Sequence, residues 1–235
     1  MKLEELEAKI NALTETVDEL KVKLKDKKIV EEQLAARLRN MEDIESIKKL
    51  QRAYCYYLEH WQEEEIIGLW SHSPEVSVEL NETGLYKGWN AVKKSFSFPI
   101  HYTAYTGEKT APPEFLHLIM PLAGIVDVDS DGKNAKARWY SLFHGALYRG
   151  GKLRAIIGAG IWENEYIKEH GIWKFKKLFF NNIFSSPYED GWVKTPYIPN
   201  PPNQDRPAPG PNTHFATYPS GYIFPYHYKN PVRGK

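Results

Sequence analysis

Apolar residues recur at alternating intervals of three and four over the first part of the chain. The series runs Leu3, Leu6, Ile10, Leu13, Val17, Leu20 and Leu24. A sustained period of 3.5 residues keeps one seam facing a partner helix, so the pattern predicts a coiled coil over residues 1–40. The pattern lapses at residues 25–28 and resumes, shifted, at Val30, Leu34 and Leu38.

This arm is highly charged, with nine acids balanced by nine bases and no aromatic residue, Gly or Pro. One interpretation is a solitary charged helix packed on its own domain. So thin an apolar stripe buries little surface alone, however, and we expect a homo-oligomer, a dimer or a trimer. The branched residues Ile10 and Val17 at one seam position, with leucine at the other, favour two strands.

A globular domain is predicted over residues 41–193, which hold all seven tryptophans. Helical spacing runs from Ile44 to Trp61, and residues 63–71 and 89–96 are two further predicted helices. The predicted strands are 76–80, 116–120, 124–128, 135–147, 153–167 and 173–184, with hairpin turns at 129–132 and 169–171. This order predicts an α+β fold, in which a curved antiparallel sheet wraps around helices and buries the aromatic residues.

Residues 194–235 form a third part, because they carry ten of the 16 prolines. Such proline density excludes helix and favours extended or polyproline conformation. A disordered tail is one interpretation. Eight aromatic residues between Trp192 and Tyr228 argue against it, and we expect the extension to be ordered on the domain or on a neighbouring subunit.

Composition excludes several classes of protein. No run of about 18 apolar residues is present, and the acidic start of the chain is unlike a signal peptide, so we expect a cytoplasmic protein that does not bind membranes. The net charge of +1 gives no general attraction to nucleic acid. The single cysteine, Cys55, excludes an internal disulfide and a zinc site built from several thiolates.

The motifs of several common enzyme classes are missing. The sequence has no glycine-rich phosphate loop, no His-Glu-x-x-His and no Gly-x-Ser-x-Gly. The remaining chemistry is acid–base catalysis, without metal or cofactor. The candidates are Tyr54 and Glu59, five residues apart on the first domain helix, and His117 in an otherwise apolar strand. Each also has a structural interpretation: a core tyrosine, a solvated charge and a histidine bonded to backbone.

The order of several motifs resembles the SnoaL-like branch of the nuclear transport factor 2-like superfamily. The resemblance is carried by Ile44–Glu59, by His117 before Asp127–Gly132, and by the strand pair Gly160–Tyr166 and Gly171–Phe175. It covers about residues 41–192 and implies a cone-shaped fold, with a curved sheet around a pocket closed by helices. It also implies cofactor-free catalysis by His, Asp and Tyr, which matches His117 and Tyr54. Glu59 stands where the family often has Asp.

Three shorter segments are similar to a subgroup of bacterial lyases that release formaldehyde from lignin-derived diaryl compounds. They are Ala135–Trp139, Trp162–Tyr166 and Ser186–Trp192. The resemblance implies a cofactor-independent lyase for a small aromatic or phenolic substrate, acting by C–C cleavage or by dehydration. A cofactor-free isomerase or cyclase, and a non-catalytic ligand-binding or assembly module, are the alternatives.

Further residues are candidates for binding an aromatic substrate, by flat contact or by charge. They are Tyr57, Trp61, Arg138, Trp139, Tyr140, His144 and Trp162. Strict alternation along the strand 135–143 places Arg138 and Tyr140 on one face and Trp139 and Ser141 on the other. Both sets therefore line one pocket only if a bulge intervenes.

Overall fold

The computed structural model describes residues 2–97, 113–149, 152–199 and 207–234. The chain divides into two compact units, Met1–Asp43 and Ile44–Lys235. Helix α1, Leu3–Glu59, forms the first unit and begins the second. It contains no Gly or Pro, so nothing in its 57 residues interrupts the backbone hydrogen bonds of the helix. In the first unit the apolar seam from Leu3 to Leu38 is exposed.

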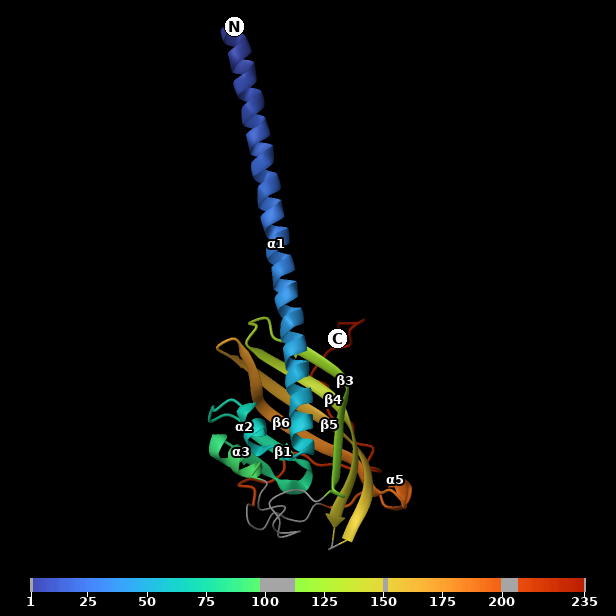
Figure 1. Cartoon of the computed structure of the whole chain (residues 1–235). Coiled ribbons are helices and arrows are strands. Elements are labelled where there is room, and N and C mark those ends of the chain that lie inside the picture. The colour runs from blue at the N-terminus through green and yellow to red at the C-terminus, as the bar shows by residue number, and fades with distance from the viewer. Residues whose placement is uncertain (1, 98–112, 150–151, 200–206, 235) are drawn as a thin grey trace. The chain divides into compact units, whose positions relative to one another are not determined.

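The second unit is an α+β fold built on a six-stranded sheet in the order β2-β1-β6-β5-β4-β3 (Figure 1). The strands are β1 Ser77–Leu80, β2 Leu85–Lys87, β3 Leu116–Val128, β4 Asn134–Arg149, β5 Lys152–Glu169 and β6 Ile172–Pro187. All neighbouring strands are antiparallel except β1 and β6. The sheet curves without closing, because β2 and β3 are edges. The predicted curved antiparallel sheet is therefore confirmed.

Short helices accompany the sheet: α2 Glu63–Gly68, the 3₁₀ helix η1 Asn81–Thr83, α3 Trp89–Ser95 and α5 Gly191–Lys194. Aromatic side chains fill the space between the helices and the inner face of the sheet. Tyr54 of α1 is fully buried and makes edge contacts with Phe96, Trp162 and Phe175. This burial is the main favourable term for the fold and fixes the last part of α1 against β5 and β6.

The two expected hairpins are confirmed, and one expected strand break is wrong. His170 and Gly171 join β5 to β6 in a two-residue turn, with φ of 50° and 82°, as a tight hairpin requires. The predicted strands 116–120 and 124–128 are one strand, β3, interrupted only by a bulge between Leu122 and Ile125. A Cβ on Gly124 would lie 2.0 Å from the Trp139 ring, so this glycine permits the close approach.

The C-terminal extension contacts the outer face of the sheet through Thr213 and Phe224. The buried Glu79 carboxylate accepts hydrogen bonds from the backbone N–H and the hydroxyl of Thr213, both at 2.7 Å. Phe224 packs beside Ile161 and Phe179 in a small second core. These contacts tie the extension to β1, β5 and β6. In the part of the chain that the structure describes, no helix is long and apolar enough to span a bilayer.

Candidate active site

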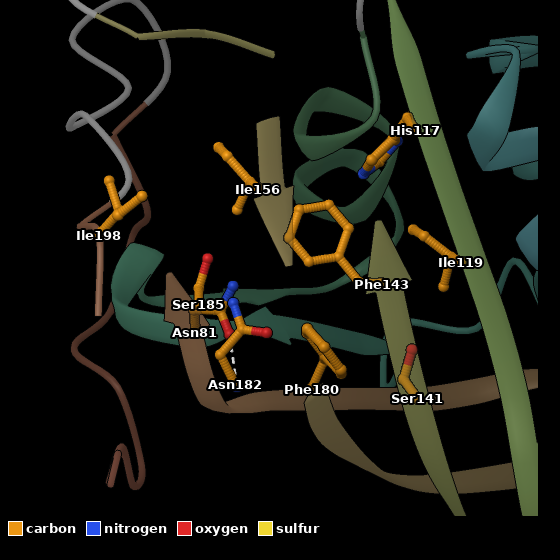
Figure 2. A pocket seen from close by; sticks show the side chains of 10 residues that line it. All are labelled: Asn81, His117, Ile119, Ser141, Phe143, Ile156, Phe180, Asn182, Ser185 and Ile198. Carbon is orange, nitrogen blue, oxygen red and sulfur yellow. Dashed lines mark hydrogen bonds between the residues drawn. The ribbon is translucent and has the colours of Figure 1, made fainter. Parts of the chain in front are cut away.

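A cavity of about 110 Å³ lies on the inner face of the sheet, where β3, β4, β5 and β6 curve (Figure 2). Its wall is mainly apolar and aromatic, with a few polar groups. The lining residues are Asn81, His117, Ile119, Ser141, Phe143, Ile156, Phe180, Asn182, Ser185 and Ile198. An apolar pocket with a few converging polar groups is the usual form of a small-molecule site.

His117 is the titratable residue among the described residues of this lining. It projects from β3 and is surrounded by aromatic rings, with Phe143 at 5.8 Å and Phe115 at 6.0 Å between ring centroids. Its Nδ1 accepts a hydrogen bond from Trp61 Nε1 at 3.3 Å. Since an indole N–H only donates, this bond selects the neutral tautomer in which the proton of His117 is on Nε2.

The end of helix α1 places Trp61 for this bond. Gln62 N–H bonds to the carbonyl of Tyr57 at 2.9 Å, and Trp61 N–H bonds to that of Leu58 at 3.2 Å. This is the hydrogen-bond pattern of a Schellman ending, in which the residue at the position of Trp61 is usually glycine. Trp61 instead has a φ of 50°, which is strained for a bulky side chain. Strained conformations of this kind cluster at functional sites.

Two side chains of the lining present polar atoms that have no hydrogen-bond partner among the described residues. Ser141 Oγ, on β4, is fully buried, and Asn182 Oδ1, on β6, belongs to a residue that is 7% exposed. The backbone N–H of Asn182 donates to Asn81 Oδ1 at 2.8 Å, which fixes that part of β6. Leaving buried polar atoms unpaired costs free energy, so these atoms favour a polar ligand in the cavity.

Tyr54 and Trp162 lie behind the cavity and are not part of its lining. Trp162 packs on the lining residue Phe180 with a centroid distance of 4.1 Å, and Tyr54 contacts Trp162 from the other side at 5.7 Å. The Tyr54 hydroxyl and Trp162 Nε1 also have no partner in the described part of the chain. Burial raises the pKa of Tyr54 well above its usual value, so the phenol stays neutral.

Glu59 does not join His117. Its carboxylate accepts a hydrogen bond from the backbone N–H of Ile119 at 3.2 Å. It lines a separate groove of about 280 Å³ between α1 and the edge strand β3, together with Arg52, Cys55 and Tyr56. The expectation that Tyr54, Glu59 and His117 line one pocket therefore does not describe the structure. The partner that orients His117 is Trp61, and Glu59 instead joins α1 to β3.

The predicted substrate-binding residues separate by strand face, because β4 pairs with β5 without a bulge from Asn134 to Arg149. Trp139 is buried on the inner face, where its Nε1 donates to the Tyr166 hydroxyl at 3.2 Å. Tyr57 is half-buried and packs against the core. Arg138, Tyr140 and His144 lie on the outer face and do not line the cavity, contrary to their expected role in binding.

Arg138 has a different set of contacts, all on the outer face. Its guanidinium forms a salt bridge with Glu163 and donates to the backbone carbonyls of Phe224 and Pro225, at 3.1 and 2.7 Å. It also lies 4.4 Å from the centre of the Tyr226 ring. This arginine therefore attaches the C-terminal extension to the sheet, and it is not available to bind a substrate anion in the cavity.

Among the described lining residues the sequence predicted only His117 as a site residue. It did not predict the polar Asn81, Ser141, Asn182 and Ser185 or the apolar Ile119, Phe143, Ile156, Phe180 and Ile198. A signal was present for two of them, since Asn182 and Ser185 are small polar residues beside the apolar Ile183 and Phe184 of the last predicted strand. Nothing local marks Ile198, which reaches the cavity because the backbone of residues 196–198 pairs with Ser185. Over the described residues, no group of three His, Cys, Asp or Glu side chains is placed to hold a metal ion.

Comparison with known proteins fixes the family. The sequence pattern of the SnoaL-like domain matches residues 39–178. The chain belongs to the SnoaL-like family. This SnoaL-like chain matches no curated protein sequence. Four lining residues, Phe180, Asn182, Ser185 and Ile198, lie beyond the matched segment, so part of the cavity wall comes from the chain that follows it.

Solved structures share the fold of this SnoaL-like chain at low sequence identity. A candidate scytalone dehydratase from Novosphingobium aromaticivorans is 18% identical, with a TM-score of 0.52 over 64% of this chain and 90% of its own. The hexachlorocyclohexane dehydrochlorinase LinA-type3 from Novosphingobium barchaimii is 17% identical, with a TM-score of 0.52 over 70% of this chain and 99% of its own. At this identity the likeness establishes the fold alone.

Proposed function

We propose that the protein is a cofactor-independent lyase that acts on a small aromatic or phenolic compound in the cavity on the inner face of the sheet. The observation that carries the proposal is the hydrogen bond from Trp61 Nε1 to His117 Nδ1. That bond leaves the proton of His117 on Nε2, where it can be donated to an oxygen atom of the substrate. The reactions named for two neighbours in fold, a dehydratase and a dehydrochlorinase, support an elimination.

The proposed chemistry removes a leaving hydroxyl group. His117 Nε2–H donates its proton to the hydroxyl oxygen, which departs as water while a C=C bond forms in the substrate, and the proton that the substrate loses returns to Nε2 through solvent, so the ring begins and ends neutral. In an aryl 1,3-diol the electron pair comes from the bond to the hydroxymethyl carbon, which is released as formaldehyde, and the proton lost is that of its O–H. In a β-hydroxy carbonyl compound the electron pair and the proton come from the neighbouring C–H bond, so that only water is released.

Ser141 and Asn182 hold the substrate in this proposal. Their unpartnered oxygen atoms accept or, for the serine hydroxyl, donate hydrogen bonds to the polar groups of the substrate. The rings of Phe143 and Phe180 provide the apolar wall. The cavity of about 110 Å³ is smaller than the ~150 Å³ that admits benzene, so the part bounded by the described residues holds at most a single ring. Tyr54 and Glu59 take no direct part.

The experiment is incubation of the full chain with a panel of aryl 1,3-diols and aryl β-hydroxy ketones. Absorbance of the conjugated product and released formaldehyde are measured separately, because formaldehyde appears only if a C–C bond breaks. Product formation that is lost in His117→Ala and kept in His144→Ala supports the proposal, since His144 lies on the opposite face of the sheet. Equal turnover in wild type and His117→Ala would contradict it.

One observation favours a second function, a non-catalytic ligand-binding module. No carboxylate is found among the described residues that line the cavity. In that case the same panel binds without turnover. Saturable quenching of tryptophan fluorescence by a compound that is recovered unchanged would identify this function.

A further inference from the structure

The apolar seam of α1 keeps one heptad register from Leu3 to Met41. Leu34 lies 14 residues, or two heptads, after Leu20, and Leu38 lies 14 residues after Leu24. No residue is therefore inserted into or lost from the heptad repeat, and the change of register expected at Val30 is wrong. Only two seam positions in this span are polar, Lys27 and Glu31. Unbroken heptads over this length are typical of a supercoiled helix with a partner along its whole seam.

The seam is exposed in the single chain. Leu13, Leu20 and Leu34 have exposed fractions of 65%, 58% and 64%. An apolar stripe of this length, rimmed by charge, marks an association surface. Because heptads a and d of one helix fit the same positions of an identical helix, the pattern is complementary to itself.

The two polar seam residues indicate how the copies align. Lys27 Nζ lies 3.8 Å from Glu31 Oε1 on the same helix, so they occupy adjacent layers of the seam. In a parallel pair in register, these two layers bring two lysines and two glutamates together, and each lysine can reach the glutamate of the other copy. Any shift by a heptad would place these charges against leucine, which is costly.

We propose that the first unit of this protein pairs with a second copy of the chain as a parallel, in-register, two-stranded coiled coil from Leu3 to Met41. Branched Ile10 and Val17 at position a, with leucine at position d, favour two strands. The Lys27 and Glu31 layers fix the register. The proposal is independent of the proposed function, because it concerns only residues of the first unit.

An antiparallel pair fits less well. It could also place Lys27 opposite Glu31, but it would then place Leu13 opposite Glu45 and leave the seam N-terminal to Leu13 without leucine partners. In the parallel, in-register pair every apolar seam residue lies opposite the same apolar residue of the other chain. The charges beside the seam do not by themselves decide between the parallel and the antiparallel pair. In the parallel pair Lys2 would attract Glu7 of the other copy, whereas Lys23 would repel Lys28 of the other copy.

The first test is the mass of the full chain by sedimentation equilibrium. We expect twice the 27.2 kDa of one chain for the wild type, and a lower mass for the double variant Leu13→Lys/Leu20→Lys. Val22→Lys is the matched control, because Val22 is apolar and 60% exposed but lies off the seam. A mass that the seam variant leaves unchanged overturns the proposal, and a wild-type mass of three chains overturns the two-stranded arrangement.

The second test is the direction of the strands. In the parallel pair Leu20 lies opposite Leu20 of the second chain. Leu20→Cys is therefore expected to form a disulfide-linked dimer under mild oxidation, whereas Val22→Cys is not. The native Cys55 does not interfere, because it is 2% exposed and burial raises its pKa to about 12. In the antiparallel pair Leu20 faces Leu38. Cross-linking between Leu20→Cys and Leu38→Cys chains, without linking within either variant, overturns the parallel arrangement.

The third test is the polar layer. Lys27→Glu gathers four acids in the seam and is expected to weaken the dimer about tenfold, and Lys27→Glu/Glu31→Lys restores both charges and the affinity. Glu32→Lys, off the seam, is the control. A single variant that dimerises like the wild type shows that these side chains do not meet, and overturns the assigned register.

Discussion

Trp61 Nε1 donates a hydrogen bond to His117 Nδ1 across 3.3 Å, joining the end of α1 to the wall of the cavity in β3. The two residues are 56 positions apart in the chain. The bond decides which nitrogen of His117 carries the proton, and thereby which chemistry the ring can perform. In the proposed mechanism, a histidine fixed in this way is a donor toward the cavity, which distinguishes the site from a simple histidine base.

Replacement of His117 tests the centre of the proposed site. His117→Ala should lower turnover by a factor of about 10² to 10⁴, the usual contribution of a positioned proton donor. The fold should persist, since the side chain is only partly buried at the edge strand. Turnover is measured beside circular dichroism, with the outer-face variant His144→Ala as control. A folded His117→Ala protein with wild-type turnover removes His117 from the mechanism.

Replacement of Trp61 tests its role in positioning His117. Trp61→Phe keeps an aromatic ring but removes the N–H donor that orients His117. We expect kcat to fall about tenfold with little change in KM, because the substrate still binds while Nε2–H is no longer held toward it. The measurement is kcat and KM of the wild type and the variant. A change in KM alone would contradict a positioning role for Trp61.

Removal of the Tyr54 hydroxyl is predicted to stabilise the protein. The group is buried without a partner among the described residues, and Tyr54→Phe relieves that cost, by about 1 kcal/mol. Turnover should remain within about threefold, because Tyr54 lies behind Trp162 and not in the cavity lining. Urea denaturation and turnover are compared in the same preparations. A hundredfold slower enzyme would show instead that the hydroxyl donates to the substrate.

Ile198 is predicted to set the size of the cavity from the C-terminal extension. Ile198→Ala enlarges the cavity, so KM for a single-ring substrate should rise about threefold to tenfold, the effect of one to a few lost methylene contacts, with kcat less affected. Compounds with a larger ring substituent should become better substrates. Ile223→Ala, at an exposed site in the same extension, is the control. Identical changes in both variants would contradict the prediction.

A partly buried link between Ser71, which follows α2, and the β5–β6 hairpin gives a pH-dependent contribution to stability. The hydroxyl of Ser71 donates to Glu169 at 2.6 Å, and this bond, followed by Lys174, lowers the pKa of Glu169. A lowered pKa stabilises the folded state above the unfolded pKa of about 4.3, and the effect is lost as pH falls.

Ser71→Ala should therefore cost about 1 kcal/mol at pH 7, a modest value because Glu169 is partly exposed, and less at pH 3. Urea denaturation of wild type and variant at both pH values measures the difference. The hydrogen bond from Ser73 N–H to Ser71 Oγ is lost at both, so it cancels in the comparison. A cost that is equal at pH 7 and pH 3 would show that the Glu169 charge contributes nothing.

Local patterns in the sequence determined much of this protein. The alternation along β4 correctly separated Arg138 and Tyr140 from Trp139 and Ser141, because side chains on an unbulged strand alternate by geometry alone. The turn at residues 169–171 followed from the freedom of Gly171 to take a positive φ. The helix spacing, the hairpins and the family motifs were sufficient for the fold, since each depends on residues close together in the chain.

Tertiary structure alone decided the contents of the site. The Glu59 carboxylate bonds to the backbone N–H of Ile119 and not to His117. The distance between this carboxylate and the His117 ring depends on how α1 packs against β3, which the sequence spacing does not encode. The Arg138 guanidinium donates hydrogen bonds to the backbone carbonyls of Phe224 and Pro225, which lie 86 and 87 residues further along the chain. No periodicity encodes such pairings. They follow from the curvature of the sheet and the course of the extension, which are fixed only when the whole domain packs.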